Sequence, residues 1–285
     1  MLHQFSRCNS RYVRIWQMLA YGDSAGASVM GVQACPVPTA VLSTHTGGFG
    51  EVSCRDLTDF ISPCLRHWRQ IGIAFDCIYS GFLCSERQIH NVTEFFEAYP
   101  NALKVVDPVM GDHGKAYKTI SPEIRADMAS LVAQADIITP NLTEACMLLG
   151  TAYPTEPISR HTAKSWLARL SEIGPDTVVI TGVPLAEGRI FNLGYDKRHN
   201  SYWCVAADYV PVSYPGTGDI YASVLVGSLL TGDSLPLAME RATRFLEVAI
   251  KTTYSYGTDP REGVMLESAL PWLIGRNILC GYSSL

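Results

Sequence analysis

The chain has 285 residues and a net charge of −5, with 47% hydrophobic and 17% charged residues. This length and composition suit one large α/β domain or two small ones, and we predict a single domain over residues 1–285. The sequence has no basic run that favours nucleic acid, no apolar stretch long enough to span a bilayer, and no CxxC pair among its nine cysteines. We therefore expect a cytoplasmic protein in a reducing compartment, with no zinc site and no disulfide framework.

Five short runs of largely β-branched residues predict strands, and each leads into a turn or hydroxyl residue. These runs are Thr39–Ser43, Phe75–Tyr79, Lys104–Val106, Asp136–Thr139 and Thr177–Ile180. Amphipathic stretches between them predict helices over residues 85–99, 121–135 and 159–173. The spacing of about 30–40 residues fits repeated βαβ units, so we expect a doubly wound, mostly parallel sheet with helices on both faces.

Two segments follow this repeat. Residues 206–214 predict an antiparallel edge strand, and residues 270–285 predict a packed tail because they are apolar but too short for a membrane anchor. In doubly wound folds, ligands bind beyond the carboxyl ends of the strands. Most of the chemically interesting residues of this chain follow directly after a predicted strand, which places a candidate site at that edge of the sheet.

The run Pro215-Gly216-Thr217-Gly218-Asp219 precedes an apolar helical stretch. Its two glycines allow a tight turn, and the free N–H groups at the start of the helix can bind an anion such as phosphate. An acid at that position is suited to taking a proton from a hydroxyl group that attacks phosphorus. The alternative is that Asp219 and the glycines form only a helix N-cap.

Three other strand ends carry polar groups. Asp107 and Asp112 could hold Mg²⁺ or a monovalent cation near a nucleotide, or could form a plain turn. Asn141 and Glu144 match a capping box, and that geometry could also present the acid to a phosphate-bound Mg²⁺. Thr181 and Gly182 could contact a nucleotide phosphate or form a strand-to-loop turn.

The segments Asp107-Pro-Val-Met-Gly-Asp112, Pro140-Asn-Leu-Thr-Glu144 and Gly216-Thr-Gly-Asp219 resemble, in order and spacing, the pyridoxal/pyridoxamine kinases of the ribokinase-like superfamily. Ser43-Thr-His-Thr-Gly47 and Tyr79-Ser-Gly-Phe82 match this family as well. The resemblance covers residues 30–271. It implies a ribokinase-like three-layer α/β/α sandwich.

The resemblance also implies transfer of a phosphoryl group from ATP·Mg²⁺ to the 5′-hydroxymethyl group of a B6 vitamer. Asp219 would be the general base, and the amides of Gly216, Thr217 and Gly218 would hold the transferring phosphoryl group. Asp107 and Glu144 would lie near the metal, which could be joined by K⁺. The remaining implied contacts are Asn141, Thr181 and Gly182 for the nucleotide, and Ser43, His45, Thr46 and Phe82 for the substrate. Relatives are often homodimers, and they often carry Tyr at the position of Phe82.

The N-terminal segment departs from this family, whose members begin with a strand and a loop of the type His-Asp-x-Ser-Gly-x-Gly-(Arg/Lys)-Cys-Ser. The codons for Ile15 to Leu19, shifted by one base, must encode Gly, then Lys or Arg, then Cys. We therefore hypothesise a local frameshift within residues 1–29, in the gene or in its sequencing. For the chain as written, polar residues such as Arg14 and Gln17 predict loss of a central strand and weaker substrate binding.

Two alternatives stay open. A hydroxymethylpyrimidine kinase would share the fold and the Gly-x-Gly-Asp element, and only its substrate would differ. The chain could also be an ATP-binding protein with impaired catalysis. A Rossmann dehydrogenase is disfavoured, because no GxGxxG follows the first predicted strand.

Overall fold

A computed structural model describes residues 13–18, 21–45, 48–186, 189–275 and 279–285. Its centre is a nine-stranded sheet in the order β13-β12-β11-β10-β9-β6-β5-β1-β2, which is parallel from β10 to β2 and antiparallel from β10 to β13. The strands of this sheet are β1 (Val13–Met18), β2 (Val32–Pro36), β5 (Cys77–Ser80), β6 (Leu103–Val106), β9 (Ile137–Ile138), β10 (Thr177–Ala186), β11 (Arg189–Asp196), β12 (Ser201–Asp208) and β13 (Tyr282–Ser284).

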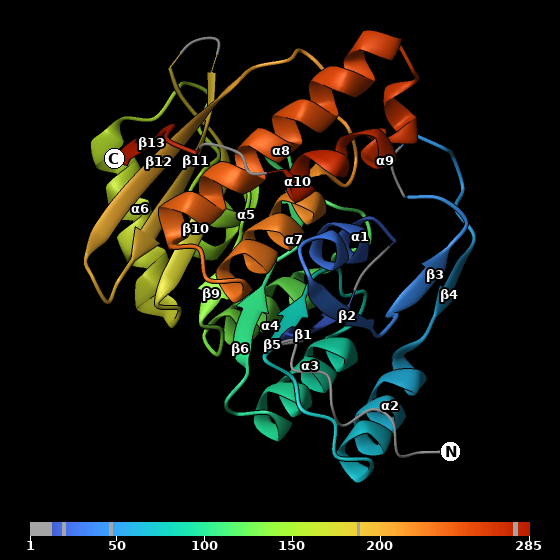
Figure 1. Ribbon diagram of the computed structural model, residues 1–285. Coiled ribbons are helices and arrows are strands. Elements are labelled where there is room, and N and C mark those ends of the chain that lie inside the picture. The colour runs from blue at the N-terminus through green and yellow to red at the C-terminus, as the bar shows by residue number, and fades with distance from the viewer. Residues whose placement is uncertain (1–12, 19–20, 46–47, 187–188, 276–278) are drawn as a thin grey trace.

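Helices cover both faces of the sheet, which gives three layers (Figure 1). One face is covered by α1 (Tyr21–Val29), α7 (Thr217–Leu230) and α8 (Leu235–Tyr256), joined by α9 (Leu266–Ala269) and α10 (Pro271–Ile274). The other is covered by α2 (Thr58–Gln70), α3 (Glu86–Ala98), α4 (Pro122–Val132), α5 (Leu142–Leu149) and α6 (Arg160–Ile173). A 3₁₀ turn, η1 (Pro260–Glu262), follows α8.

The alternation of side chains along each central strand divides the core in two. Ile78 packs into the core beneath α2 to α6, whereas its neighbours Cys77 and Tyr79 pack beneath α1 and α7. Likewise, Val178 of β10 packs into the core beneath α2 to α6, and Val179 packs into the core beneath α7 and α8. Successive residues of a strand point to opposite faces, so a sheet covered on both sides needs apolar residues at every position. The short continuous apolar runs predicted as strands satisfy this requirement.

The predicted helices are confirmed, and each begins at a serine. The side chains of Ser85, Ser121 and Ser159 accept hydrogen bonds from N–H groups in the first turns of α3, α4 and α6. Serine is a favoured N-cap because its hydroxyl satisfies an N–H group that the helix leaves without a partner. These local signals place the starts of the three helices within one residue of the predictions.

The prediction for Thr39–Ser43 is wrong in one respect. Residues Ala40–Leu42 form β3, which pairs antiparallel with β4 (Cys54–Asp56) in a separate two-stranded sheet, here called the β3–β4 hairpin. The edge of the main sheet is taken by β2, which ends at Pro36. Proline has no N–H group for a sheet ladder, and Pro38 follows two residues later, so the chain leaves the main sheet there.

The predicted edge strand over residues 206–214 is also placed differently. The corresponding strand is β12, which ends at Asp208 and lies between β11 and β13, so it is not at the edge. The edge position belongs to β13 from the C-terminal tail. The expected packing of that tail is confirmed, because Leu273 and Leu285 are both 7% exposed.

The expected loss of a central strand near the N-terminus is wrong. Residues Val13–Met18 form β1, which pairs in parallel with β2 on one side and β5 on the other. Hydrogen bonds of the backbone form this ladder whatever the side chains are, and Val13, Ile15 and Trp16 favour extended structure. Residues 1–12 and 19–20, which are part of the segment of the hypothesised frameshift, lie outside the described residues.

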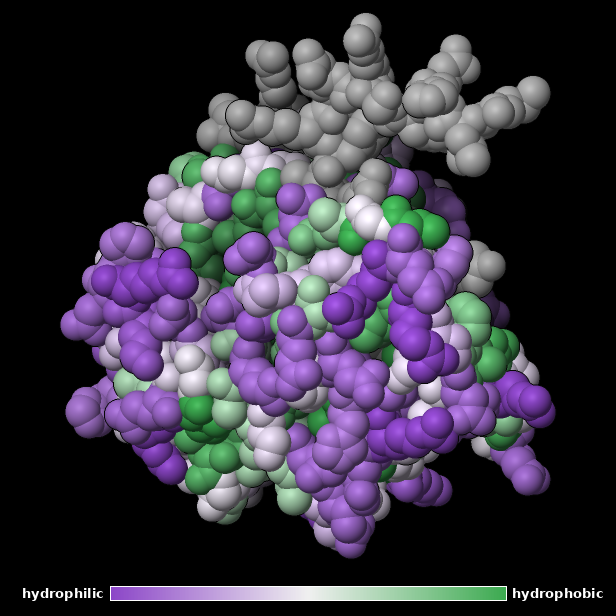
Figure 2. Space-filling model, turned by 90° about the horizontal axis from the view of Figure 1, so that it is seen from below, coloured by the Kyte–Doolittle hydropathy of each residue, from purple (hydrophilic) through white to green (hydrophobic). Residues whose placement is uncertain are grey.

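Figure 2 shows the molecule from below, relative to the view of Figure 1. This face is mainly hydrophilic, and its hydrophobic residues form separate small patches. This pattern is expected where amphipathic helices turn a polar face outward. None of the described helices combines the length and apolar character required to cross a membrane.

Candidate active site

The adjacent strands β5, β6 and β9 lead into the segments of Phe82, Asp107 and Asn141, and Thr181 of the neighbouring β10 pairs with Asn141 at the same edge of the sheet. Beyond the end of β6, the N–H group of Asp107 donates to the carbonyl of Ser80, the last residue of β5, at 2.8 Å. Thr181 N likewise donates to the carbonyl of Pro140, at 3.0 Å, and Thr181 pairs with Asn141 in a short parallel bridge. These bonds continue the ladder past the strand ends, so the side chains that follow are held in fixed positions.

Asp107 is a buried acid, 6% exposed, at the centre of this edge. The phenol of Tyr79 donates a hydrogen bond to its Oδ2 at 3.2 Å. Burial, and after it the negative charge of Asp219, raise the pKa of Asp107 to about 8, despite the opposing hydrogen bond from Tyr79. A carboxylate in this position favours a cation close to it.

Asn141 and Glu144 form the predicted capping box of α5, with Glu144 N donating to Asn141 Oδ1 at 3.0 Å and Asn141 N to Glu144 Oε2 at 2.8 Å. The same side chains hold the segment after β6: Met110 N donates to Glu144 Oε1 at 3.0 Å, and Asn141 Nδ2 donates to the Gly111 carbonyl at 2.8 Å. The predicted capping box is therefore present, and the same two side chains fix the loop that carries Asp107.

Gly111 opens a small hairpin formed by β7 (Gly111–Asp112) and β8 (Lys115–Ala116). A Cβ atom at Gly111 would lie only 2.2 Å from the Lys115 carbonyl oxygen, so no larger residue fits there. Tyr117 follows β8. Burial, and then the charges of Asp112, Glu144, Asp219 and Asp107, raise its pKa above the ordinary value, which places its hydroxyl among these carboxylates.

The predicted anion site lies at the start of α7. Gly216, the N-cap, has φ of 80°, a left-handed conformation that suits glycine. The first helical hydrogen bond runs from Ile220 N to Gly216 O, at 3.0 Å, and no side chain of the described residues caps the helix. The N–H groups of the first turn are therefore available to an anionic ligand.

Asp219 lies in this first turn, close enough to Asp107 for the two charges to interact. Burial of its carboxyl group raises the pKa of Asp219 to about 6. Burial and the charge of Asp107 raise the pKa of Glu144 well above its usual range. Asp219, Asp107 and Glu144 thus form a row of carboxylates, here called the carboxylate row, between the Gly216 turn at the start of α7 and α5.

Thr181 and Gly182 lie in β10, where the pairing with β11 shifts register between Ile180 and Val183. Gly182 has φ of 70°, and its N–H group donates to Oδ1 of the buried Asn192 at 3.2 Å. Asn192 Nδ2 donates in turn to Thr243 Oγ1 of α8 at 2.9 Å. Buried side chains of β11 and α8 therefore fix the bulge that carries the predicted nucleotide contacts.

The predicted substrate residues lie on or beside the β3–β4 hairpin. Ser43 Oγ accepts a hydrogen bond from Ser53 N within the hairpin, at 3.1 Å. His45 Nε2 lies 2.7 Å from the carbonyl oxygen of Arg261. Phe82, after β5, is half-buried, and its carbonyl accepts from Thr39 Oγ1 at 3.2 Å. Thr46 lies outside the described residues.

Three residues of this edge were not among the sequence-based site predictions: Tyr79, Tyr117 and Asn192. Tyr79 directly precedes Ser80-Gly81, so its place in a matching segment was an available signal. Tyr117 and Asn192 carry no local signal, because only the folded chain brings them to the carboxylates and to the bulge of β10.

In the described part of the chain, no group of three or more His, Cys, Asp or Glu side chains is arranged to hold a metal ion. The buried carboxylates of Asp107 and Glu144 still fit a hard cation chemically, because such ions prefer oxygen ligands and would relieve the repulsion in the carboxylate row. The protein oxygens alone would not complete its coordination, which leaves room for phosphate oxygens and water.

Comparison with known proteins agrees with this geometry. Residues 22–263 match the family model described as phosphomethylpyrimidine kinase. A structure from Bacteroides thetaiotaomicron, assigned to the phosphomethylpyrimidine kinases and crystallised with pyridoxal, is 38% identical, with a TM-score of 0.92 over 96% of this chain and 100% of that one. The pyridoxal kinase of Lactobacillus plantarum is 29% identical, with a TM-score of 0.83 over 92% and 96% of the two chains.

A pyridoxal kinase from Arabidopsis thaliana is 31% identical over 240 residues, which is 79% of this chain and 74% of the relative. The matched region includes the strand ends and the start of α7 described above. The α/β/α architecture, the expected ribokinase-like fold and the kinase resemblance are thereby confirmed. The chain belongs to the phosphomethylpyrimidine kinase family and, within the ribokinase-like superfamily, is a relative of the pyridoxal kinases.

Proposed function

We propose that this protein is an ATP-dependent kinase that phosphorylates the 5′-hydroxymethyl group of pyridoxal, pyridoxamine or pyridoxine. The observation that carries the proposal is Asp219, a carboxylate of raised pKa placed beside the free N–H groups that begin α7. A base next to an anion-binding turn suits attack by a hydroxyl group on phosphorus. The names of the relatives, and the pyridoxal bound to the Bacteroides protein, support a B6 vitamer as the acceptor.

In the proposed step, Asp219 takes the proton of the 5′-hydroxyl group as its oxygen attacks the γ-phosphorus of ATP. The bond between the γ-phosphorus and the bridging oxygen breaks, and ADP leaves with that oxygen. The proton remains on Asp219 until it passes to solvent. A pKa near 6 suits this role, because the group is mostly ionised at neutral pH and can still accept a proton.

The amides of Gly216, Thr217 and Gly218 would hold the transferring phosphoryl group. Negative charge on the phosphoryl oxygens is favoured at a helix N-terminus by unpaired N–H groups and by the helix dipole. The left-handed Gly216 opens α7, whose first turn also carries Asp219 of the carboxylate row. The turn would therefore set the line of attack between the hydroxyl of the substrate and the phosphorus.

Mg²⁺, when bound with ATP, would neutralise phosphate charge. Asp107 and Glu144 would hold the ion near the phosphates, partly through water, and K⁺ is a second candidate ion beside Asp107. Asn141 would act by fixing the loop that carries Asp107, since both ends of its side-chain amide bond to protein. Thr181 and Gly182 would contact the nucleotide at the bulge of β10.

On the acceptor side, Phe82 and the β3–β4 hairpin residues Ser43, His45 and Thr46 would surround the pyridine ring. Phe82 offers an apolar face and no hydroxyl group. We also propose that the protein works as a homodimer in the cytoplasm, which sedimentation analysis and fractionation would test. The eight cysteines among the described residues carry free thiols, which suits a reducing compartment.

The test is ATP-dependent phosphorylation by the purified chain, with pyridoxal, pyridoxamine, pyridoxine and hydroxymethylpyrimidine as acceptors. Turnover of a B6 vitamer that disappears in Asp219→Asn supports the proposal. Hydroxymethylpyrimidine is included because the family model carries a pyrimidine kinase description. Preference for that acceptor would replace the proposed substrate, and turnover that persists in Asp219→Asn would refute the role of the base.

A further inference from the structure

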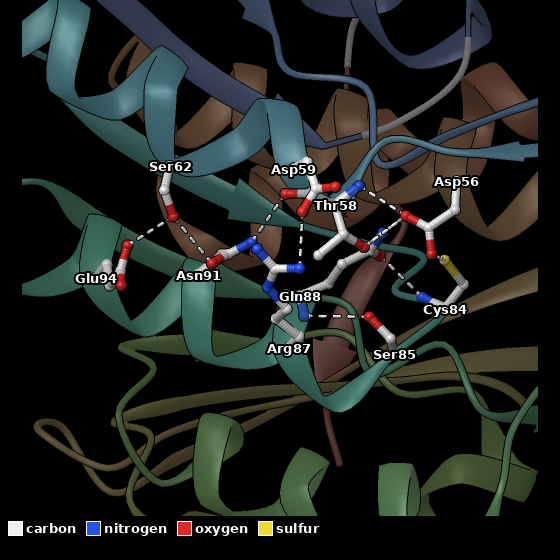
Figure 3. Close-up of polar contacts among 10 residues, drawn as sticks. All are labelled: Asp56, Thr58, Asp59, Ser62, Cys84, Ser85, Arg87, Gln88, Asn91 and Glu94. Atoms are coloured by element: carbon white, nitrogen blue, oxygen red, sulfur yellow. Dashed lines mark hydrogen bonds and ion pairs between the residues drawn. The ribbon is translucent and has the colours of Figure 1, made fainter.

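A polar network joins Asp56 and Thr58, at the base of the β3–β4 hairpin, to Gln88 of α3 (Figure 3). Its centre is Gln88, which is 0% exposed in the first turn of α3, a helix whose neighbouring buried residues are mostly apolar. A neutral side chain of similar size without hydrogen-bonding groups would suit such a core. A buried amide persists at low cost only where its donors and acceptors are paired.

The amide of Gln88 contacts three segments that are distant in sequence. Its Oε1 accepts from Cys84 N at 3.0 Å. Its Nε2 donates to the carbonyl of Thr39 at 2.9 Å and to Thr58 Oγ1 at 2.9 Å. One side chain therefore ties together the chain entering β3, the loop after β5 and the start of α2.

Asp56, the last residue of β4, completes the network. Its Oδ1 accepts from Thr58 N at 2.6 Å and from the Thr58 hydroxyl, and Gln88 Nε2 lies 3.4 Å away. Figure 3 shows Gln88 and Thr58 directed toward Asp56, with Cys84 on the other side of that carboxylate. The hydrogen bonds of Thr39 and Asp56 thus hold both strands of the hairpin at its base.

These contacts lie close to the proposed acceptor site. Thr39, which Gln88 holds by its carbonyl, donates its hydroxyl to the carbonyl of Phe82, and Cys84 is only two residues beyond Phe82. Ser43 lies at the far end of β3. We propose that Gln88 is a positioning residue for the acceptor substrate: it fixes the β3–β4 hairpin and the loop that carries Phe82 relative to each other.

The inference rests on the proposed function, because it assigns the acceptor site to Phe82 and the hairpin. Among the described residues, the side-chain amide of Gln88 forms no hydrogen bond with the carboxylate row or with the bulge of β10. Its loss should therefore weaken binding of the vitamer without a matching effect on ATP. A merely structural role would lower stability and affect both substrates alike.

The decisive variant is Gln88→Met, which keeps the volume of the side chain and removes both hydrogen-bonding groups. Asn91→Leu is the matched control. Asn91 lies one turn later on the same helix, is 5% exposed, and bonds to Thr58 O and Ser62 rather than to the hairpin. Steady-state kinetics would give KM for pyridoxal, KM for ATP and kcat for each protein, and thermal unfolding would give Tm.

We expect Gln88→Met to raise KM for pyridoxal about tenfold, the size expected when buried polar groups lose their partners, with little change in KM for ATP. Asn91→Leu should lower Tm to a similar extent and leave both KM values near those of the parent. Equal changes in the two KM values for Gln88→Met, or an unchanged KM for pyridoxal, would overturn the proposal.

Amide hydrogen exchange gives a second measurement that does not depend on the substrate. Gln88→Met should speed exchange in residues 39–43, 54–56 and 81–84, and Asn91→Leu should not. If the parent fails to phosphorylate B6 vitamers but the exchange difference is found, the proposed function fails while the hairpin contact stands. Unchanged exchange in these segments would refute the positioning role whatever the substrate.

Discussion

Asp219 combines a raised pKa with a position at the start of α7, where the N–H groups of the first turn have no helical partners. A base that must also lie beside anionic phosphates needs this arrangement, because the helix N-terminus offsets part of the repulsion. Substitution at this residue separates loss of the base from loss of phosphate binding.

We expect Asp219→Asn to lower kcat about 10²–10⁴-fold, the usual contribution of a general base, with a much smaller change in KM for ATP. The chain supplies a matched control in Asp233, which also follows a Thr-Gly pair but forms an ion pair with Arg241 at 2.9 Å. Asp233→Asn should retain nearly full kcat. Comparable losses in the two variants would show that the effect is not specific to the proposed base.

The pH dependence of kcat/KM should report the same carboxyl group. The step requires ionised Asp219, so the rate should fall about tenfold per pH unit on the acid side of about 6. The measurement is kcat/KM for pyridoxal from pH 5 to 8, at saturating ATP and Mg²⁺. If kcat/KM falls only below a pH of about 4, the ordinary pKa of an aspartate, the raised pKa of Asp219 is wrong.

The contribution of Asp107 to stability should depend on pH in the opposite direction from that of an acid in an ion pair. Its pKa of about 8 in the folded chain exceeds the ordinary 3.8, so the folded chain binds more protons between these values. Its contribution to stability is therefore full at low pH and is lost as pH rises through about 8. We expect Asp107→Asn to raise the free energy of unfolding by roughly 1–3 kcal/mol at pH 8.5.

Thermal unfolding without divalent cations would measure this gain, which should shrink toward pH 4, where the wild-type carboxyl group is protonated. Adding Mg²⁺ and ATP should reduce the difference at pH 8.5, because bound cations compensate the charge of Asp107. A lower Tm for Asp107→Asn at high pH would mean that the buried carboxylate is already compensated within the protein.

At the scale of elements, the β3–β4 hairpin is held at both ends. Gln88 holds its base, and Arg261 of η1 holds its tip by donating to the Gly48 carbonyl at 3.3 Å and by lying over the ring of Phe49. The carbonyl of Arg261 also faces His45. The C-terminal part of the chain therefore helps to place a proposed substrate residue that lies more than two hundred residues earlier.

We expect Arg261→Ala to raise KM for pyridoxal about fivefold, because the cation–π and hydrogen-bond contacts at the tip of the hairpin are lost, with kcat nearly unchanged. Arg87→Ala is the control, since Arg87 pairs with Asp59 on the exposed surface of α3 and α2. Steady-state kinetics on both variants checks the result. An equal rise in KM for Arg87→Ala would assign the effect to net charge instead of the hairpin.

At the scale of the whole molecule, the N-terminal segment is the main departure from the family pattern. The strand β1 forms between β2 and β5, so the sheet is continuous, but the sequence lacks the family pattern His-Asp-x-Ser-Gly-x-Gly-(Arg/Lys)-Cys-Ser expected after it. A sheet can keep its ladder through backbone bonds alone, whereas a binding loop depends on its side chains. The altered segment should therefore weaken binding of the acceptor more than it disturbs the sheet.

We expect the variant with the shifted reading frame restored over residues 8–25 to have a higher Tm and a lower KM for pyridoxal than the chain as written. Its KM for ATP should be similar, because the strand ends and the turn at Gly216 are the same in both. Determining the DNA sequence of the gene tests the frameshift itself. Equal KM values for pyridoxal in the two proteins would show that the altered segment is tolerated.

The order of amino acids alone is sufficient for the local features of this protein. Apolar runs predict β5, β6, β9 and β10, amphipathic stretches predict α3, α4 and α6, and Gly216-Thr-Gly-Asp219 predicts a helix start suited to phosphate. Each of these depends on interactions within a few residues, which a sequence records directly.

Long-range packing determines the rest. The β3 strand leaves the main sheet because β2 already occupies its edge, and β13 from the C-terminus displaces β12 from the other edge. Burial by distant segments raises the pKa values in the carboxylate row. Contacts between distant segments place Tyr79 and Tyr117 near this row and give Gln88 hydrogen-bond partners from three parts of the chain. Desolvation and contact are properties of the assembled layers, and no local pattern of residues encodes them.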